Sequence, residues 1–276
     1  MSLLFPRDLE EACEMLAASG GEAVPLAGGT DLLVHWPQRF EDHRRTYVDI
    51  SQLEELRQIR WTGDELILGG GVTYWQTLED REICDAFPLL AEAARQVGAV
   101  QIQARGTWAG NIVNASPAAD GVPVLMAYDA AVELVSAHGT EELPLADFYL
   151  GYKRMRRRPV QLIRALRLPR RRYDVEVFEK IGPRRAQAIT KVGFAAAHSS
   201  AGWRLVANSL APSVRRCPAL EKLLEEGADV ARPEDLLAAI DQDVSPIDDI
   251  RSTAEYRRLV FARTLFHALF GGAALQ

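Results

Sequence analysis

The sequence predicts an α+β protein in which two α/β lobes are followed by a C-terminal α+β lobe with a small antiparallel sheet. Short apolar runs alternate with helical patterns through the first part of the chain. A long apolar segment at residues 186–197 and another at 203–208 then flank a Ser- and Gly-containing turn, which is typical of a hairpin. We therefore expect lobes at about residues 1–55 and 56–170, and a C-terminal lobe at residues 171–276.

The composition is that of an ordinary globular protein of 276 residues, with 48% hydrophobic and 25% charged residues. No run approaches the ~20 consecutive apolar residues of a membrane-spanning helix, and the N-terminus lacks the pattern of a signal peptide. We therefore expect a cytoplasmic protein without a membrane span. The formal net charge of −6 argues against general nucleic-acid binding.

The cysteines and histidines predict no metal site. Cys13, Cys84 and Cys217 form neither a CxxC pair nor an iron–sulfur ligand run, so we expect reduced thiols that mostly serve packing. The histidines show no spacing typical of metal ligands. They are His35, His43, His138, His198 and His267.

In the first lobe, residues 8–19 have the periodicity of an amphipathic helix that ends at Gly20 and Gly21. The residues expected on its buried face are Leu9, Ala12, Cys13 and Leu16. Residues 23–27 and 46–50 are short apolar runs and are expected to form strands.

The second lobe is predicted to begin with a hairpin, in which residues 62–64 connect strands at 56–61 and 65–69. Thr73 can cap the helix that follows, and Pro88 begins another helix that Gly98 closes. The remaining elements expected here are a helix near 121–127 and strands at 131–137, 140–143 and 160–168. Trp61 and Trp75 are expected to pack in the core.

The C-terminal lobe is predicted to contain strands at 174–178, 186–197 and 203–208, and helices near 218–226, 233–241 and 252–270. Ser252 to Glu255 has the capping-box pattern at the start of the last helix. One face of this helix is expected to be buried against the sheet. The members of that face are Tyr256, Leu259, Val260, Phe266 and Phe270.

The stretch from Arg105 to Asp120 joins two small-residue turns to a row of short polar side chains. Gly106 and Gly110 permit a ligand to approach the backbone closely, and successive N–H groups in such a turn can bind phosphate. A plain loop between a strand and a helix is an equal alternative from this stretch alone.

A second Gly-rich turn lies upstream, at Val24 to Val34. Gly28 and Gly29 permit positive φ, and Thr30 and Asp31 suit the first turn of a helix. Neither turn has the G-x-G-x-x-G pattern, so a Rossmann nicotinamide site is not supported. Two such turns about 80 residues apart suggest one long ligand lying between two lobes.

The most basic run in the chain is Lys153 to Arg158. A solvated loop is the plain interpretation. A docking patch for an acidic partner, or an approach path for a phosphate-bearing electron acceptor, is the functional alternative.

Three segments in order, Pro25–Leu33, Arg105–Asp120 and Asp249–Arg258, resemble signatures of one family. This is the FAD-binding medium subunit of the molybdenum hydroxylases, the group of carbon monoxide dehydrogenase, xanthine dehydrogenase and 4-hydroxybenzoyl-CoA reductase. The resemblance implies a p-cresol methylhydroxylase-type FAD-binding domain, in which two α/β lobes clamp an extended FAD and a third lobe covers the flavin end. It implies an FAD-binding domain at 1–170 and a C-terminal flavoprotein domain at 171–276.

The resemblance also implies which residues bind FAD. The pyrophosphate would be wrapped by the first turn, which comprises Pro25, Leu26, Ala27, Gly28, Gly29, Thr30, Asp31 and Leu32. The second phosphate- and flavin-facing turn would comprise Thr107, Trp108, Ala109, Gly110 and Asn111. Asp120 would hydrogen-bond the ADP part, and Val97 and Ile163 would pack on the cofactor. Lys180 would stabilise negative charge on the reduced ring, its alternative being an exposed strand lysine.

One position departs from the family pattern, which usually has two glycines before the asparagine. Here Ala109 and Gly110 precede Asn111, and Ala109 narrows the φ range of the turn. Trp108 either stacks beside the isoalloxazine or points into the core.

The function implied is that of the electron-exit subunit of a heterotrimeric molybdenum-containing hydroxylase or dehydrogenase. Electrons would come from a large molybdopterin subunit through a small iron–sulfur subunit, reach FAD on this chain, and leave to NAD, a quinone or oxygen. No catalytic nucleophile or metal ligand is expected. The alternatives are a stand-alone FAD-dependent reductase of the same fold class, a covalent flavin oxidase and a cofactor-free scaffold subunit.

Overall fold

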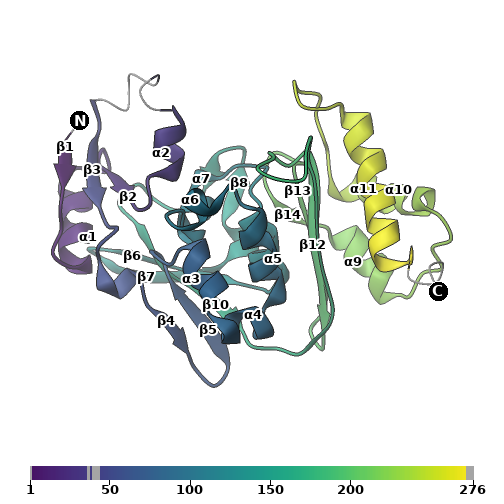
Figure 1. Ribbon diagram of the computed structural model, residues 1–276, viewed down its shortest axis with the longest axis horizontal. Helices are drawn as coiled ribbons and strands as arrows, with labels where there is room; N and C mark the ends of the chain where they lie inside the picture. The colour runs from purple at the N-terminus through teal and green to yellow at the C-terminus, as the bar shows by residue number, and fades with distance from the viewer. Residues whose placement is uncertain (1, 36–37, 39–43, 272–276) are drawn as a thin grey trace.

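The computed structural model describes residues 2–35, 38 and 44–271. Figure 1 shows the chain running along the long axis of the molecule, so that the two termini lie at opposite ends. Sheets of three, five and four strands follow one another along this axis, and a two-stranded hairpin accompanies them. The expected mixture of helices and small sheets is confirmed.

The first lobe is built on a parallel sheet in the order β1-β3-β2. Its elements are β1 (Ser2–Leu4), α1 (Leu9–Ala18), β2 (Val24–Leu26), α2 (Thr30–His35) and β3 (Thr46–Asp49). Helix α1 begins where the Asp8 side chain accepts a hydrogen bond from the backbone N–H of Glu11. The predicted face of α1 is buried against β3. Strand β1 was not foreseen from the sequence.

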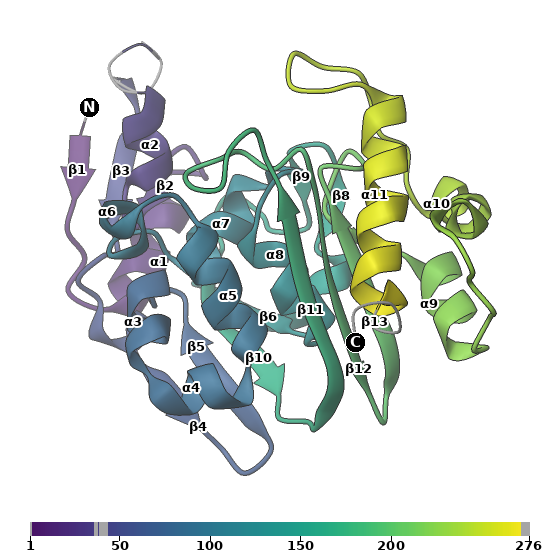
Figure 2. The same cartoon turned by 45° about the vertical axis from the view of Figure 1, so that its right-hand side comes forward.

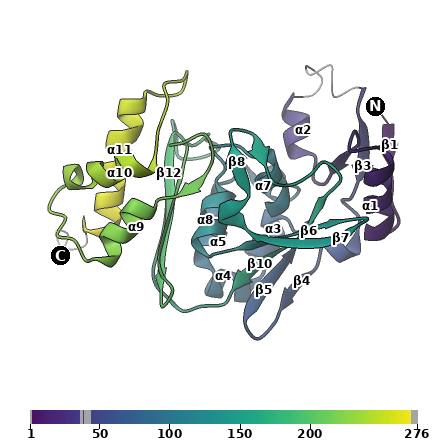
Figure 3. The same ribbon diagram turned by 180° about the vertical axis from the view of Figure 1, so that it is seen from behind.

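The middle lobe contains an antiparallel sheet in the order β4-β5-β10-β6-β7. Its strands are β4 (Ile59–Trp61), β5 (Glu65–Gly69), β6 (Ala131–Ser136), β7 (Gly139–Pro144) and β10 (Leu162–Pro169). Strand β10 is the last in sequence but lies centrally, between β5 and β6, and so closes the lobe. Seen from behind, β6 and β7 lie in front of the helices that cover the other face (Figure 3).

Those helices are α3 (Tyr74–Glu79), α4 (Arg81–Ala86), α5 (Pro88–Gln96), α6 (Val100–Gln103), α7 (Trp108–Asn114) and α8 (Gly121–Ala127). Thr73 and Gln76 form a capping box at α3, as the cap at Thr73 predicts. Short 3₁₀ turns occupy Glu54–Leu56 and Leu145–Asp147, and the small hairpin consists of β8 (Tyr149–Gly151) and β9 (Arg154–Met155). Trp75 is 37% exposed, so its predicted place in the core is wrong.

The C-terminal lobe has an antiparallel sheet covered on its outer face by helices. The strands are β11 (Tyr173–Ile181), β12 (Val192–Ser199), β13 (Gly202–Asn208) and β14 (Arg215–Arg216). The helices are α9 (Pro218–Glu225), α10 (Leu237–Asp243) after a 3₁₀ turn at Pro233–Leu236, and α11 (Ala254–Leu269). Strand β12 starts at Val192, later than predicted.

The sheet of the C-terminal lobe separates two apolar cores. Ala195 and Ala197 of β12 belong to the core of the middle lobe, whereas Phe194 and Ala196 belong to the core beneath α11. Figure 2 shows β11 and β12 standing between α5 and α8 on one side and α11 on the other. The predicted boundary near residue 170 lies between β10 and β11, and the division into domains there stays a prediction.

The expected buried face of α11 is only partly right. Val260, Phe266 and Phe270 are partly buried and pack against the core beneath the helix, whereas Tyr256 is 42% exposed. The fully buried residues of α11 are Arg257, Phe261, Ala262 and Leu265. Apolar residues occur nearly all round this helix, so their periodicity does not select one face. The cap also differs, because Thr253 rather than Ser252 accepts the hydrogen bond from the backbone N–H of Tyr256.

Within the described residues, no helix is both long enough and apolar enough to cross a membrane. The same part of the chain has no group of three or more His, Cys, Asp or Glu side chains that could hold a metal ion. His43 lies outside the described residues.

Candidate cofactor-binding site

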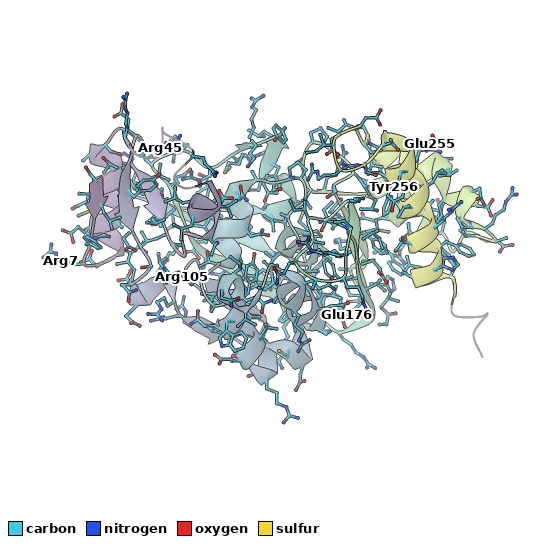
Figure 4. All side chains as sticks on the ribbon, turned by 45° about the horizontal axis from the view of Figure 1, so that its top comes forward. Arg7, Arg45, Arg105, Glu176, Glu255 and Tyr256 are labelled. Carbon is cyan, nitrogen blue, oxygen red and sulfur yellow. The ribbon has the colours of Figure 1, made fainter. Side chains whose placement is uncertain are left out.

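A cavity of about 660 Å³ lies between the first and middle lobes and is lined by both Gly-rich turns. This volume is within the range of pockets that hold small molecules and cofactors. Figure 4 shows Arg45, which lines it, and Arg105 in the half of the molecule that contains the first lobe, away from Tyr256 on α11. A cavity is therefore present at the place where the sequence predicts a ligand between two lobes.

Most of the predicted site residues come together around this cavity. They are Pro25, Leu26, Ala27, Gly28, Gly29, Thr30, Asp31, Leu32, Val97, Thr107, Ala109, Gly110, Asn111 and Ile163. Trp108, Asp120 and Lys180 are not among the residues that line it.

The two turns touch each other through their backbones. A Cβ atom on Gly28 would lie 1.8 Å from the carbonyl oxygen of Arg105, which no side chain could tolerate. The Arg105 Nε donates a hydrogen bond to the Gly28 carbonyl, at 3.1 Å. Gly29 adopts a φ of +71°, in the left-handed region that favours glycine. The first turn therefore needs glycine for packing against the second, as well as for any ligand.

The second turn is the start of a helix rather than a plain loop. Thr107 is the N-cap of α7, and its hydroxyl accepts a hydrogen bond from the backbone N–H of Gly110, at 2.9 Å. Ala109 lies in the first turn of this helix and has no positive φ. Alanine in place of the family glycine therefore imposes no backbone strain at this position.

The side chain of Trp108 points into the core. It is fully buried, its indole N–H donates to the Thr77 hydroxyl at 2.8 Å, and its ring meets that of Tyr74 edge-on at 4.7 Å. Of the two alternatives for Trp108, packing in the core is the one observed, and this leaves no indole face for stacking on a ligand.

Asn111 is among the residues that line the cavity. Its side-chain oxygen is buried and has no hydrogen-bond partner. The start of α8 packs so closely here that a Cβ on Gly121 would lie 2.9 Å from this oxygen. A buried acceptor without a donor costs free energy. This oxygen faces α8 rather than the cavity, so the fit of the site to a polar cofactor rests on the two Gly-rich turns and the cations that line it.

The cavity wall contains two cations that pair with no carboxylate of the described residues. Of the described residues that line it, the charged ones are Arg45, Lys153, Arg157 and Asp31, and Arg45 already has an interaction partner. Lys153 and Arg157 contact carbonyl and amide oxygens, which leaves their charges uncompensated and favours an anionic ligand. Sequence reasoning noted the basic run Lys153–Arg158 but did not connect it with the Gly-rich turns, which are about 40 or more residues away along the chain.

Asp120 and Lys180 bind each other. The Lys180 Nζ lies 2.6 Å from the Asp120 carboxylate and donates to the Gln96 carbonyl at 2.8 Å. The Thr190 hydroxyl donates to the other Asp120 oxygen. Burial raises the pKa of the Asp120 carboxyl, and the Lys180 ammonium opposes this rise. The Lys180 side chain is 6% exposed, so the alternative of an exposed strand lysine is wrong. Direct contacts of this pair with a cofactor stay a prediction.

Comparison with known proteins places this site in a family. The family described as the FAD binding domain in molybdopterin dehydrogenase matches residues 1–171, and the CO dehydrogenase flavoprotein C-terminal domain matches residues 178–270. The xanthine dehydrogenase FAD-binding subunit of Escherichia coli O157:H7 is 29% identical over 88% of this chain and 86% of its own. The nicotinate dehydrogenase FAD-subunit of Eubacterium barkeri is 33% identical over 68% of this chain and 65% of its own.

The fold agrees with these matches. Carbon monoxide dehydrogenase from Hydrogenophaga pseudoflava, solved in a form that lacks the Mo-pyranopterin moiety of the molybdenum cofactor, contains a chain that superposes with a TM-score of 0.90. The two are 26% identical, and the match covers 99% of this chain and 97% of that one. This chain therefore belongs to the FAD-binding subunits of the molybdenum hydroxylase family, which are oxidoreductase subunits with FAD as their cofactor.

Proposed function

We propose that this chain transfers electrons from iron–sulfur clusters on a small partner subunit to an external acceptor. The oxidised substrate would bind a large molybdopterin-containing subunit. The observation that supports this most is the cavity between the two Gly-rich turns, with Lys153 and Arg157 in its wall. FAD can take up two electrons together and release them together or one at a time, which suits a link between clusters and an acceptor.

The residues of this chain bind and orient the cofactor. The backbone N–H groups of Pro25–Leu32 surround its phosphates, apart from Pro25, which has no N–H. In the second turn, the N–H groups of Trp108, Gly110 and Asn111 already donate within the protein, so those of Thr107 and Ala109 are the ones that reach the phosphates. Val97 and Ile163 pack on the apolar parts of the cofactor. These roles require no nucleophile and no metal ion.

The pair formed by Asp120 and Lys180 lies at one end of the cofactor in this proposal, because the two side chains are 2.6 Å apart and the flavin and ADP ends of an extended FAD are not. The Lys180 ammonium stabilises negative charge on the reduced ring, and Asp120 holds that ammonium in place, so the hydrogen bond from Asp120 to the ADP part expected from the sequence is not retained. Both groups are buried at the junction of α8 with β11, with Thr190 and Gln96 as further partners. Their mutual contact holds both side chains in place for that purpose.

The partners of the complex follow from the same proposal. Relatives named as FAD-binding subunits or medium chains imply large and small subunits beside them, so we propose a heterotrimer. NAD or a quinone is the acceptor, the complex is cytoplasmic, and the chain divides into an FAD-binding domain at 1–170 and a C-terminal flavoprotein domain at 171–276.

The first test is an absorption spectrum of the purified chain, followed by acid release of its chromophore. We expect stoichiometric FAD. The second test adds the partner subunits and substrate under anaerobic conditions and follows the flavin absorbance. Bleaching that requires both partners supports the proposal. Rapid bleaching by NADPH without partners would instead identify a stand-alone reductase, flavin that acid does not release would identify a covalent oxidase, and a chain that never takes up FAD would be a scaffold.

A further inference from the structure

The basic run Lys153–Arg158 has two faces. Residues at alternate positions line the cavity, namely Lys153, Met155 and Arg157. The arginines between and after them are exposed, namely Arg154, Arg156 and Arg158. Arg154 and Met155 form β9, where successive side chains point to opposite faces, whereas Lys153 has a φ of +55° and lies in the turn before β9. The run is therefore neither a wholly solvated loop nor a single surface patch, because two of its cations belong to the wall of the cavity.

Arg157 is held in place by hydrogen bonds, but its Nε–H has no hydrogen-bond partner. Its Nη1 donates to the carbonyl of Gln161 at 2.6 Å, with longer contacts to the carbonyls of Arg158 and Pro159 at 3.3 and 3.5 Å. Its Nε is buried without a partner, and no carboxylate of the described residues pairs with it. Burial lowers the pKa of the Arg157 guanidinium. A buried cation without a counter-charge is costly, and an anionic ligand would offset that cost.

Lys153 lies between β8 and β9 and is held in place by α7. Its Nζ donates to the backbone carbonyl and to the side-chain oxygen of Asn114, at 3.1 Å each. This leaves one of its three N–H groups for a ligand. The Tyr149 hydroxyl donates to the Ile112 carbonyl at 2.9 Å, which fixes β8 against α7. The hairpin is thus docked on the helix that carries Asn111, and the ammonium is positioned by contacts rather than free in solvent.

We propose that Lys153 and Arg157 bind the diphosphate of the cofactor as a pair of cations in the cavity wall that the Gly-rich turns also line. This inference rests on the proposed FAD site. The diphosphate is the charged part of FAD at neutral pH, and the backbone N–H groups of the turns carry only partial charges. Ammonium and guanidinium groups form stronger, charge-assisted hydrogen bonds with phosphate oxygens. Lys153 and Arg157 both line the cavity and contact only carbonyl and amide oxygens, which agrees with this assignment.

The experiment measures the dissociation constant of FAD for the apo chain by flavin fluorescence, at low and at high ionic strength. The inner variants are Lys153→Gln, Arg157→Gln and the double variant. The matched outer controls on the same run are Arg154→Gln, Arg156→Gln and their double variant. We expect the inner double variant to bind FAD at least about tenfold more weakly and to lose most of the salt dependence. The outer double variant should stay within about twofold of the unchanged chain.

Equal FAD affinities of the inner and outer double variants would overturn the inference while leaving the FAD site itself intact. Failure of the unchanged chain to bind FAD would overturn both. Arg157 also anchors its own loop, so Arg157→Gln could lose affinity through misfolding. Lys153→Gln alone avoids this problem, because the Lys153 side chain is exposed. We expect this variant to bind FAD more weakly while its thermal unfolding midpoint stays unchanged. Riboflavin, which lacks phosphate, should bind inner and outer variants equally well.

Discussion

The Lys180 ammonium on β11 and the Asp120 carboxylate before α8 lie 2.6 Å apart, which joins the C-terminal sheet to the Gly-rich half of the molecule. Both side chains are largely buried. Removing one partner of a buried ion pair leaves an uncompensated charge, which costs more than the pair contributes. The pair is thus a structural link between two parts of the chain, whatever it does for the cofactor.

Asp120→Ala should destabilise the protein by about 3–5 kcal/mol in denaturant unfolding, because the Lys180 ammonium is left buried without its carboxylate. The double variant Asp120→Ala with Lys180→Met should recover part of that loss. Under native conditions Asp120→Ala should also weaken FAD binding by about 1–3 kcal/mol. Unchanged FAD affinity in a folded Asp120→Ala protein would remove Asp120 from the cofactor site.

Gly28→Val should abolish FAD retention, since its Cβ would overlap the Arg105 carbonyl and force the two turns apart. Overpacking of this kind costs about 1–3 kcal/mol in stability as well. The flavin content of the purified variant is the measurement. Gly63→Ala is the matched control, because a Cβ there meets nothing within 4 Å. A fully flavinated Gly28→Val protein would contradict the role given to this turn.

Trp108→Phe should lower stability by about 1–3 kcal/mol, because the buried Thr77 hydroxyl loses the indole N–H that it accepts from. The absorption spectrum of bound flavin should not change, since the indole lies in the core. Trp75→Phe, at a partly exposed site, provides a comparison with little expected loss. A shifted flavin spectrum in Trp108→Phe would show that the ring reaches the cofactor after all.

Stability at low pH should depend on Asp249, which binds the buried Arg257 at 2.7 Å. Burial raises the pKa of the Asp249 carboxyl, but hydrogen bonds from Arg251 and Arg257 outweigh this effect and bring the pKa well below its usual value of 3.8. A depressed carboxyl pKa contributes stability that is present above the unfolded value and is lost as pH falls through the folded one.

Unfolding free energies measured from neutral pH down to below pH 3.8 should therefore fall less steeply in Asp249→Asn than in the unchanged protein. Asp249→Asn should also be less stable at neutral pH, where it lacks the ionic contact. Parallel pH profiles of the two proteins would exclude Asp249 as the group responsible.

Local signals explain how much of the fold could be predicted from the sequence. The cap at Thr73, the proline at the start of α5 and the hairpin turn at residues 62–64 all act within a few residues, and the structure has each of them. The buried face of α11 could not be found this way, because it is set by contacts that are distant in sequence. Arg257 is buried there since it donates to the Ser209 carbonyl and to Asp249.

The candidate site shows the same difference between local sequence signals and contacts that are distant in sequence. The Gly-rich turns can be recognised from their composition, and both line the cavity. Which polar residues line the cavity depends on tertiary contacts that the sequence does not reveal. Lys180 and Asp120 contact each other and are not among the lining residues, while Lys153 and Arg157 line the cavity from the basic run.

Strand β12 has a consequence for dividing this protein into pieces. Alternate side chains of β12 pack into the core of the middle lobe on one face and into the core beneath α11 on the other. A fragment that ends near residue 170 would retain the Gly-rich turns but would expose the apolar surface that Ala195 and Ala197 cover. Such a fragment should be insoluble or require the remainder supplied as a second polypeptide. The two halves of the sequence are thus expected to be stable only when both are present, because they share β12.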